Sequence, residues 1–345
     1  RGCEHRIRPL EGRSKQHAAS LRLPACVTVF PHDGNVILMT LGARLGADSS
    51  TAGATVRAAV AVSTYFATLV TVRLVMVRVP MPAILANLPD QIATLCSVAM
   101  VLFVSARVFD TAPASYGLTM TRRWIHDLLG GIVVGALFQL VSTAAILGIG
   151  AGAIVDRWSM GVFTDPAAVA IAVGSTVVSF FIVALGEDLL FRGVLIREFV
   201  VGFTSRDVSR PVATVGAVVA SALLFGSLHL NAGAAGLSTA VVVLQAVVGG
   251  LYFGLAYVLT DSLALPVGIH LSTNLWTTVV FGQPESGYPA AFRLTRPFEI
   301  GPDLIIILFV PVGVLVAAVF VWVRLTRGVI PEMSLGTTAS DSSHG

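Results

Sequence analysis

Residues 167–186 have the sequence AAVAIAVGSTVVSFFIVALG, and the next seven residues are EDLLFRG. A predominantly apolar run of about 20 residues has the length that a helix needs to cross the hydrocarbon core of a bilayer. Seven further stretches have the same character, near 56–77, 91–109, 127–150, 212–230, 237–259, 263–281 and 303–323. The sequence therefore predicts an all-α, polytopic integral membrane bundle of about eight transmembrane helices.

The composition of the whole chain supports this prediction. Of the 345 residues, 55% are hydrophobic and only 12% are charged, and the mean hydropathy is +0.85. Soluble domains carry about a quarter charged residues, so this chain lacks the polar surface of a soluble globule. Intrinsic disorder needs far fewer apolar residues. The cysteines Cys3, Cys26 and Cys96 are odd in number and lack metal-ligand spacing, which excludes a disulfide-rich secreted scaffold.

The distribution of arginines indicates membrane topology rather than nucleic-acid binding. The formal net charge is +3, but the arginines are scattered between apolar runs, whereas a nucleic-acid-binding face needs clustered basic residues. Eight spans place both termini on one side. That side receives Arg44, Arg57, Arg107, Arg122, Arg123, Arg197, Arg206, Arg210, Arg324 and Arg327, and the other receives Arg73, Arg78, Arg157, Arg293 and Arg296. This excess predicts cytoplasmic termini, and we expect a multi-pass protein of the plasma membrane.

Ionisable residues inside or beside apolar spans are costly, and they are therefore candidate functional residues. The first group follows the run 167–186. Asp188 and Arg192 are four residues apart on one helical face, where they are expected to form an ion pair. Glu187 points about 100° away from Asp188 and has no cation on its own face. Glu187 is therefore a candidate general base.

Two histidines and an asparagine occupy two other spans. His229 follows Phe225 by four residues near the end of one span, and His270 and Asn274 share a helical face in another. Taken separately, these residues suit hydrogen bonding between membrane helices. Together with Glu187, they form a set that can activate water and stabilise an oxyanion. Two histidines and a carboxylate are equally a three-ligand catalytic zinc set, and both interpretations stay open.

Several other chemistries are excluded by the absence of their motifs. The sequence contains no His-Glu-x-x-His, Gly-x-Ser-x-Gly or Gly-x-Gly-Asp motif. It also contains no Walker lysine and no Rossmann glycine pattern, so no nucleotide is expected to bind.

The ordered motifs resemble the signature of the CPBP family, the CAAX-protease and bacteriocin-processing group, which is also called Abi. They are Glu187-Asp188-x-x-x-Arg192, Phe225-x-x-x-His229 and His270-x-x-x-Asn274, preceded by Arg123-Trp124-x-x-Asp127-Leu128. The resemblance covers roughly residues 116–282. One position departs from the pattern, because Asp188 stands where the family usually has glutamate, and its side chain is shorter by one methylene.

The resemblance implies an intramembrane endopeptidase, of a family commonly called metalloproteases. Glu187 would act as general base with His229, and His270 and Asn274 would bind the oxyanion. Arg192 would fix the acidic segment through Asp188. The implied substrates are membrane-associated peptides or proteins, prenylated in some members and bacteriocin-like in others. The cofactor stays open: Glu187, His229 and His270 would hold a zinc ion if a metal binds, and a metal-free glutamate mechanism is equally compatible.

With the resemblance, the chain divides into five predicted segments. They are a polar, disordered extension without a signal peptide (1–50), N-terminal transmembrane helices (51–115), the protease core (116–282), a loop with the last helix (283–330) and a disordered tail (331–345). Two other functions stay open. One is a non-catalytic membrane adaptor or bacteriocin-immunity protein, which would tolerate Glu187→Ala. The other is a transporter that relays protons, although no inverted repeat is evident.

Overall fold

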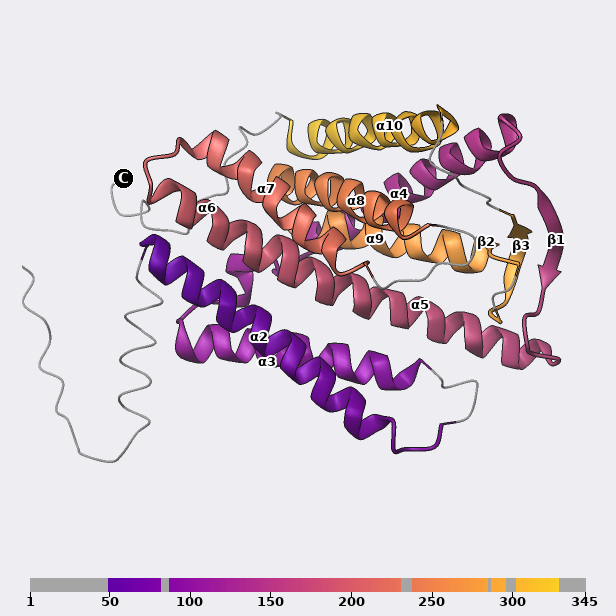
Figure 1. Ribbon diagram of the computed structural model, residues 1–345, viewed down its shortest axis with the longest axis horizontal. Helices are drawn as coiled ribbons and strands as arrows, with labels where there is room; N and C mark the ends of the chain where they lie inside the picture. The colour runs from indigo at the N-terminus through magenta and orange to yellow at the C-terminus, as the bar shows by residue number, and fades with distance from the viewer. Residues whose placement is uncertain (1–48, 82–86, 231–237, 285–286, 296–301, 329–345) are drawn as a thin grey trace, which may run out of the picture.

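The computed structural model describes residues 49–81, 87–230, 238–284, 287–295 and 302–328 (Figure 1). Nearly all of the predicted N-terminal extension and the whole predicted tail lie outside these residues. The helices are α2 (Thr51–Met76), α3 (Leu88–Val108), α4 (Arg122–Gly148), α5 (Pro166–Asp188), α6 (Arg197–Thr204), α7 (Arg210–Ser227), α8 (Thr239–Thr260), α9 (Ala264–Leu275) and α10 (Pro302–Arg327). Two π-helices, η3 (Leu189–Ile196) and η4 (Trp276–Val280), and a short 3₁₀ helix, η2 (Pro113–Tyr116), complete the helical set.

The predicted all-α multi-pass architecture is confirmed. In the described part of the chain, seven helical stretches are long and apolar enough to cross a membrane. One of them is continuous from Pro166 to Thr204, because η3 joins α5 to α6 without a break. The predicted span 263–281 corresponds to the shorter α9 and its extension η4. Large apolar side chains such as Leu74 and Val133 are 64% and 67% exposed, as expected for a surface that faces lipid.

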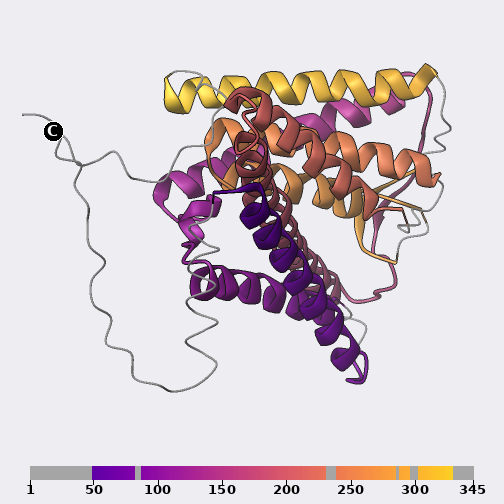
Figure 2. The same cartoon turned by 60° about the vertical axis from the view of Figure 1, so that its left-hand side comes forward.

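The helices pack side by side, with α10 on one side of the bundle and α2 and α3 on the other (Figures 1 and 2). The first helix begins and the last helix ends at the same end of the bundle (Figure 1). Two buried ion pairs tie this end together: Arg57 lies 2.7 Å from Glu198, and Arg327 lies 2.9 Å from Asp127. Trp322 also donates a hydrogen bond to Asp127, so the upstream acidic residue of the motif segment anchors α10 to α4.

A seam of glycines brings α4 and α9 into close contact. A Cβ atom added to Gly131 would lie 2.3 Å from the carbonyl oxygen of Leu265, and one added to Gly268 would lie 2.2 Å from that of Leu128. Gly135, four residues after Gly131, would clash in the same way with the Ile269 carbonyl, at 2.8 Å. Small residues at this spacing let membrane helices approach backbone to backbone. The seam therefore fixes the position of α9, which carries His270 and Asn274.

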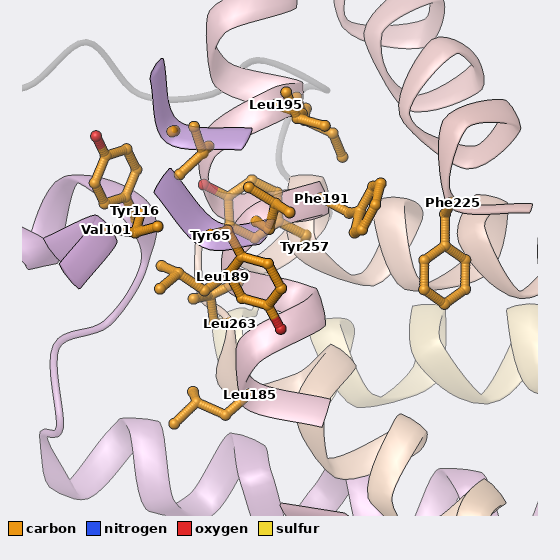
Figure 3. Close-up of a cluster of buried hydrophobic side chains, with 14 of the residues drawn as sticks. Tyr65, Val101, Tyr116, Leu185, Leu189, Phe191, Leu195, Phe225, Tyr257 and Leu263 are labelled. Carbon is orange, nitrogen blue, oxygen red and sulfur yellow. The ribbon is translucent and has the colours of Figure 1, made fainter. Parts of the chain in front are cut away.

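The largest buried apolar cluster surrounds the π-helix η3. Figure 3 shows side chains of this cluster that come from several helices, among them Tyr65, Leu189, Phe191 and Tyr257. Leu189 and Tyr257 are 0% and 1% exposed. Because η3 begins directly after Asp188, this dense packing holds the acidic pair in place.

The opposite end of the bundle carries a small sheet that the sequence did not predict. Strands β1 (Ile154–Ser159), β2 (Phe281–Gly282) and β3 (Ala290–Leu294) have the order β1-β3-β2. β1 pairs antiparallel with β3, and β2 pairs parallel with it. The sheet lies beside the start of α5 (Figure 1).

Candidate active site

The acidic pair ends α5, and the buried arginine lies in the π-helix that follows. Asp188 and Arg192 form the predicted ion pair at 3.0 Å, with side chains that are 0% and 1% exposed. The Arg192 guanidinium also lies over the rings of Phe225 and Phe253, at 4.3 and 4.9 Å from their centroids. Desolvated cation–π contacts of this kind stabilise a buried guanidinium. π-Helical turns are frequent at functional sites, and η3 begins where the candidate chemistry begins.

His270 lies between the two carboxylates. Its Nε2 atom is 3.7 Å from Oε2 of Glu187, and its Nδ1 atom is 3.5 Å from Oδ2 of Asp188. The imidazole stacks on Phe253, with ring centroids 4.7 Å apart and planes at 25°. The stack on Phe253 therefore restricts the ring, and Nδ1 faces the Asp188 carboxylate without a hydrogen bond to it. The Glu187 side chain is 30% exposed, so it is the acid of the pair that can meet water.

His229 is held by its own helix. Its Nδ1 atom lies 3.0 Å from the carbonyl oxygen of Phe225. Because a carbonyl can only accept, Nδ1 is the donor in this bond, and a neutral His229 therefore keeps a lone pair on Nε2. Within the described residues, no ion pair joins His229 to Glu187. The Phe225 ring contacts both histidines, with centroids 5.0 Å from His229 and 6.2 Å from His270.

A cavity of about 280 Å³ lies beside the two histidines. Both histidines and Asn274 line it, together with apolar side chains of α8 and α10 such as Val242 and Leu308. The Asn274 amide forms no hydrogen bond with any other side chain or backbone group that the structure describes. The cavity therefore offers an unengaged amide donor next to His270.

The zinc site that the sequence left open does not fit this arrangement. Among the described residues, no group of three or more His, Cys, Asp or Glu side chains is placed to hold a metal ion. Oε2 of Glu187 lies 3.7 Å from Nε2 of His270, but within the described residues His229 does not join these two side chains in a ligand group. A zinc site needs three ligand atoms that converge on one point. No step below is assigned to a metal.

Residues 169–276 match the family model of the type II CAAX prenyl endopeptidase Rce1-like proteins. This segment is Rce1-like. The match confirms the CPBP resemblance, and the three motifs from Glu187 to Asn274 all lie inside the Rce1-like segment. No curated protein and no solved structure matches the chain.

One neighbour of the site lies outside the Rce1-like segment and was not predicted. Tyr65 of α2 is 5% exposed, and a Cβ atom added to Gly186 would lie 2.9 Å from its hydroxyl oxygen. The Tyr65 hydroxyl therefore lies beside the residue that directly precedes the candidate base. Gly186 is the sequence signal for this contact, because a glycine directly before the acidic pair permits a close approach. Nothing in the sequence of α2 identifies Tyr65 as the partner.

Proposed function

We propose that this protein is an intramembrane endopeptidase that hydrolyses a peptide bond of a membrane-associated peptide or protein. The observation that carries the proposal is the position of His270, which lies between Glu187 and Asp188 and lines a cavity with His229 and Asn274. The Rce1-like match supports the same reaction class. In this proposal the chain's own residues supply the base, the oxyanion donors and the groups that orient them.

Glu187 would act as the general base. A water molecule that contacts both Glu187 and Nε2 of His270 would lose its proton to the carboxylate as its oxygen attacks the peptide carbonyl. The proton would then pass to the leaving amine nitrogen, with His229 assisting through Nε2. One water is consumed for each bond cleaved, and it provides the hydroxyl of the new carboxylic acid and a hydrogen of the new amine.

His270 and Asn274 would stabilise the oxyanion that forms on the carbonyl oxygen. A side-chain amide is a suitable donor, and so is the Nε2–H of an imidazole that carries a proton on both nitrogens, because Nδ1 of His270 faces Asp188. Each such donor typically contributes about 10²–10³ in rate. Asp188 would act as a positioning residue, because it holds Nδ1 of His270 and is itself held by Arg192. The aromatic stack with Phe253 restricts the same ring.

The proposal can be tested with purified protein and fluorogenic peptides, one farnesylated and one unprenylated but hydrophobic. Glu187→Gln removes the base but keeps the shape of the side chain, so kcat should fall by about 10²–10⁴. Asp90→Asn is a matched control, because Asp90 lies in an exposed ion pair with Arg73. Equal cleavage by wild type and Glu187→Gln would disprove the proposed role of Glu187. If folded wild-type protein cleaves neither peptide, the adaptor function gains support instead.

A further inference from the structure

A second cavity, the outer vestibule, lies near the end of the bundle that carries the sheet. It is lined by Asn87, Thr176, Ser179, Phe180, Thr277, Thr278, Gln283 and Tyr288 and has a volume of about 370 Å³. Phe180 is its only apolar residue among the lining residues that the structure describes. Polar side chains at membrane depth usually face protein partners or water. The volume is large enough for several water molecules.

One vestibule hydroxyl forms no hydrogen bond within the described part of the chain. Ser179 is 8% exposed, and its hydroxyl forms no hydrogen bond with any group that the structure describes. The neighbouring Thr176 differs, since its hydroxyl donates to the Ala172 carbonyl of its own helix at 2.8 Å. This hydroxyl is not among the fully enclosed polar atoms that lack a partner, so a water molecule in the vestibule can reach it and satisfy it. Ser179 therefore indicates that the vestibule is hydrated.

Hydrogen bonds join the residues that form the wall of the vestibule. Tyr288 donates a 2.6 Å hydrogen bond to the Asn87 side chain. Arg293 of β3 donates to the Gln283 carbonyl at 2.8 Å and to the Ser159 hydroxyl at 3.1 Å, and it also contacts the Tyr288 carbonyl. Arg293 is 3% exposed, and its contacts with Gln283 and Tyr288 join the sheet to two residues that line the vestibule.

Thr277 lines both the vestibule and the cavity of the candidate active site. Its hydroxyl donates to the carbonyls of Thr273 and Asn274, at 3.1 and 3.3 Å. On the facing helix, Thr176 and Glu187 are eleven residues apart, which places them on one side of α5 about 16 Å from each other. The vestibule and the candidate base therefore lie along the same side of α5.

We propose that the outer vestibule supplies water to the candidate active site past Thr277. This inference rests on the proposed hydrolysis, which consumes one water per bond cleaved. The cavity of the candidate active site has apolar walls from α8 and α10. Thr277 lies between this cavity and the vestibule, and polar residues line both cavities around it. Water reaches Glu187 from the sheet end of the bundle, and the peptide occupies the other cavity.

Cysteine accessibility tests the hydration of the vestibule without any need for activity. In a background in which Cys3, Cys26 and Cys96 are replaced by serine, Ser179→Cys is compared with Val178→Cys in sealed vesicles. Val178 is 52% exposed on the outside of the same helix and is expected to face lipid. A membrane-impermeant thiosulfonate needs a hydrated thiolate, so Ser179→Cys should react at least about tenfold faster. An equally slow reaction from both sides of the vesicle would overturn the proposal.

Filling the vestibule tests its role in catalysis. Ser179→Leu should lower kcat by about tenfold and leave KM for the peptide unchanged, because water rather than peptide becomes limiting. Val178→Leu adds volume at the lipid face and should match wild type. If wild type cleaves the peptide and Ser179→Leu cleaves it equally fast, the vestibule does not supply the water. Wild type without cleavage would count against the proposed hydrolysis, and the labelling result would still decide whether the vestibule is hydrated.

Discussion

Nδ1 of His270 lies 3.5 Å from Oδ2 of Asp188, and the other oxygen of the same carboxylate lies 3.0 Å from Arg192. One fully buried carboxylate thus lies between the imidazole and the guanidinium, close enough to attract both by charge, without a hydrogen bond to either. The CPBP pattern usually has glutamate at this position, yet the shorter aspartate spans both contacts here. Asp188 is therefore expected to retain the positioning role.

Asp188→Asn should lower kcat by about 10²-fold, because His270 loses the charge that orients Nδ1. Asp188→Glu should retain more activity than Asp188→Asn, since it restores the charge. The measurement is kcat and KM on a cleaved fluorogenic peptide. An increase in KM with unchanged kcat in Asp188→Asn would contradict a role in orienting His270.

Arg192→Met should destabilise the fold by about 3–5 kcal/mol, because it leaves Asp188 buried without a countercharge. The double variant Arg192→Met with Asp188→Asn should recover part of this loss. Thermal unfolding in detergent provides the measurement. Arg73→Met is the matched control, since the Arg73–Asp90 pair is about half exposed and should change stability by less than about 1 kcal/mol. Equal losses for the two methionine variants would refute this prediction.

Asn274→Ala should lower kcat by about 10²–10³, as expected for the loss of one oxyanion donor. KM should change little, because the amide acts mainly in the transition state. Thr273→Ala removes a neighbouring side chain of the same cavity and serves as the control. Comparable kcat values for both variants would show that Asn274 is not a specific donor.

Gly268→Ala should prevent stable packing of α9 on α4, since the added methyl would lie 2.2 Å from the Leu128 carbonyl. We expect a loss of several kcal/mol, within the upper range for overpacked sites, and a loss of cleavage. Gly148→Ala in α4 is the matched control, because nothing lies within 4 Å of its added methyl. Melting temperatures of the two variants in detergent give the test, and similar values would show that the glycine seam is dispensable.

Cleavage should persist in the presence of EDTA or phenanthroline, because Glu187, His229 and His270 do not converge as metal ligands. The assay compares initial rates with and without chelator, followed by addition of zinc. Inhibition that zinc reverses would show that the three side chains converge in the active form. Inhibition that zinc does not reverse would indicate an effect of the chelator on the detergent or the peptide. A non-chelating phenanthroline isomer is the control for such an effect.

Hydropathy and local spacing predicted much of the fold. The membrane spans follow from apolar run length, and the Asp188–Arg192 pair follows from the helical repeat, because both depend on residues close in sequence. The pairing of Glu187 with a histidine depends instead on the relative shift of α5 and α9. The position of α9 is set in part by its backbone contacts with α4 at Gly131 and Gly268, which join residues far apart in sequence, so the sequence did not predict that His270, rather than His229, would contact Glu187.

The sheet was missed for a related reason. Its strands have only six, two and five residues. β1 and β3 are far apart in sequence, with Arg157 opposite Phe292. Buried hydrogen bonds from Arg293 stabilise it, and a single arginine carries no strand signal. Tyr65 was missed because its contact with the site also crosses between distant helices.

The uninterrupted helical rod from Pro166 to Thr204 has 39 residues, or roughly 58 Å at the α-helical rise. The hydrocarbon layer is only about 30 Å thick, so such a rod has to lean steeply or project from the membrane. Glu187 stands 21 residues from one tip and 17 from the other. In the proposed cleavage, the scissile peptide bond has to move from the aqueous surface to the depth of Glu187. An extended, locally unfolded polypeptide can enter the membrane to this depth far more readily than a folded domain.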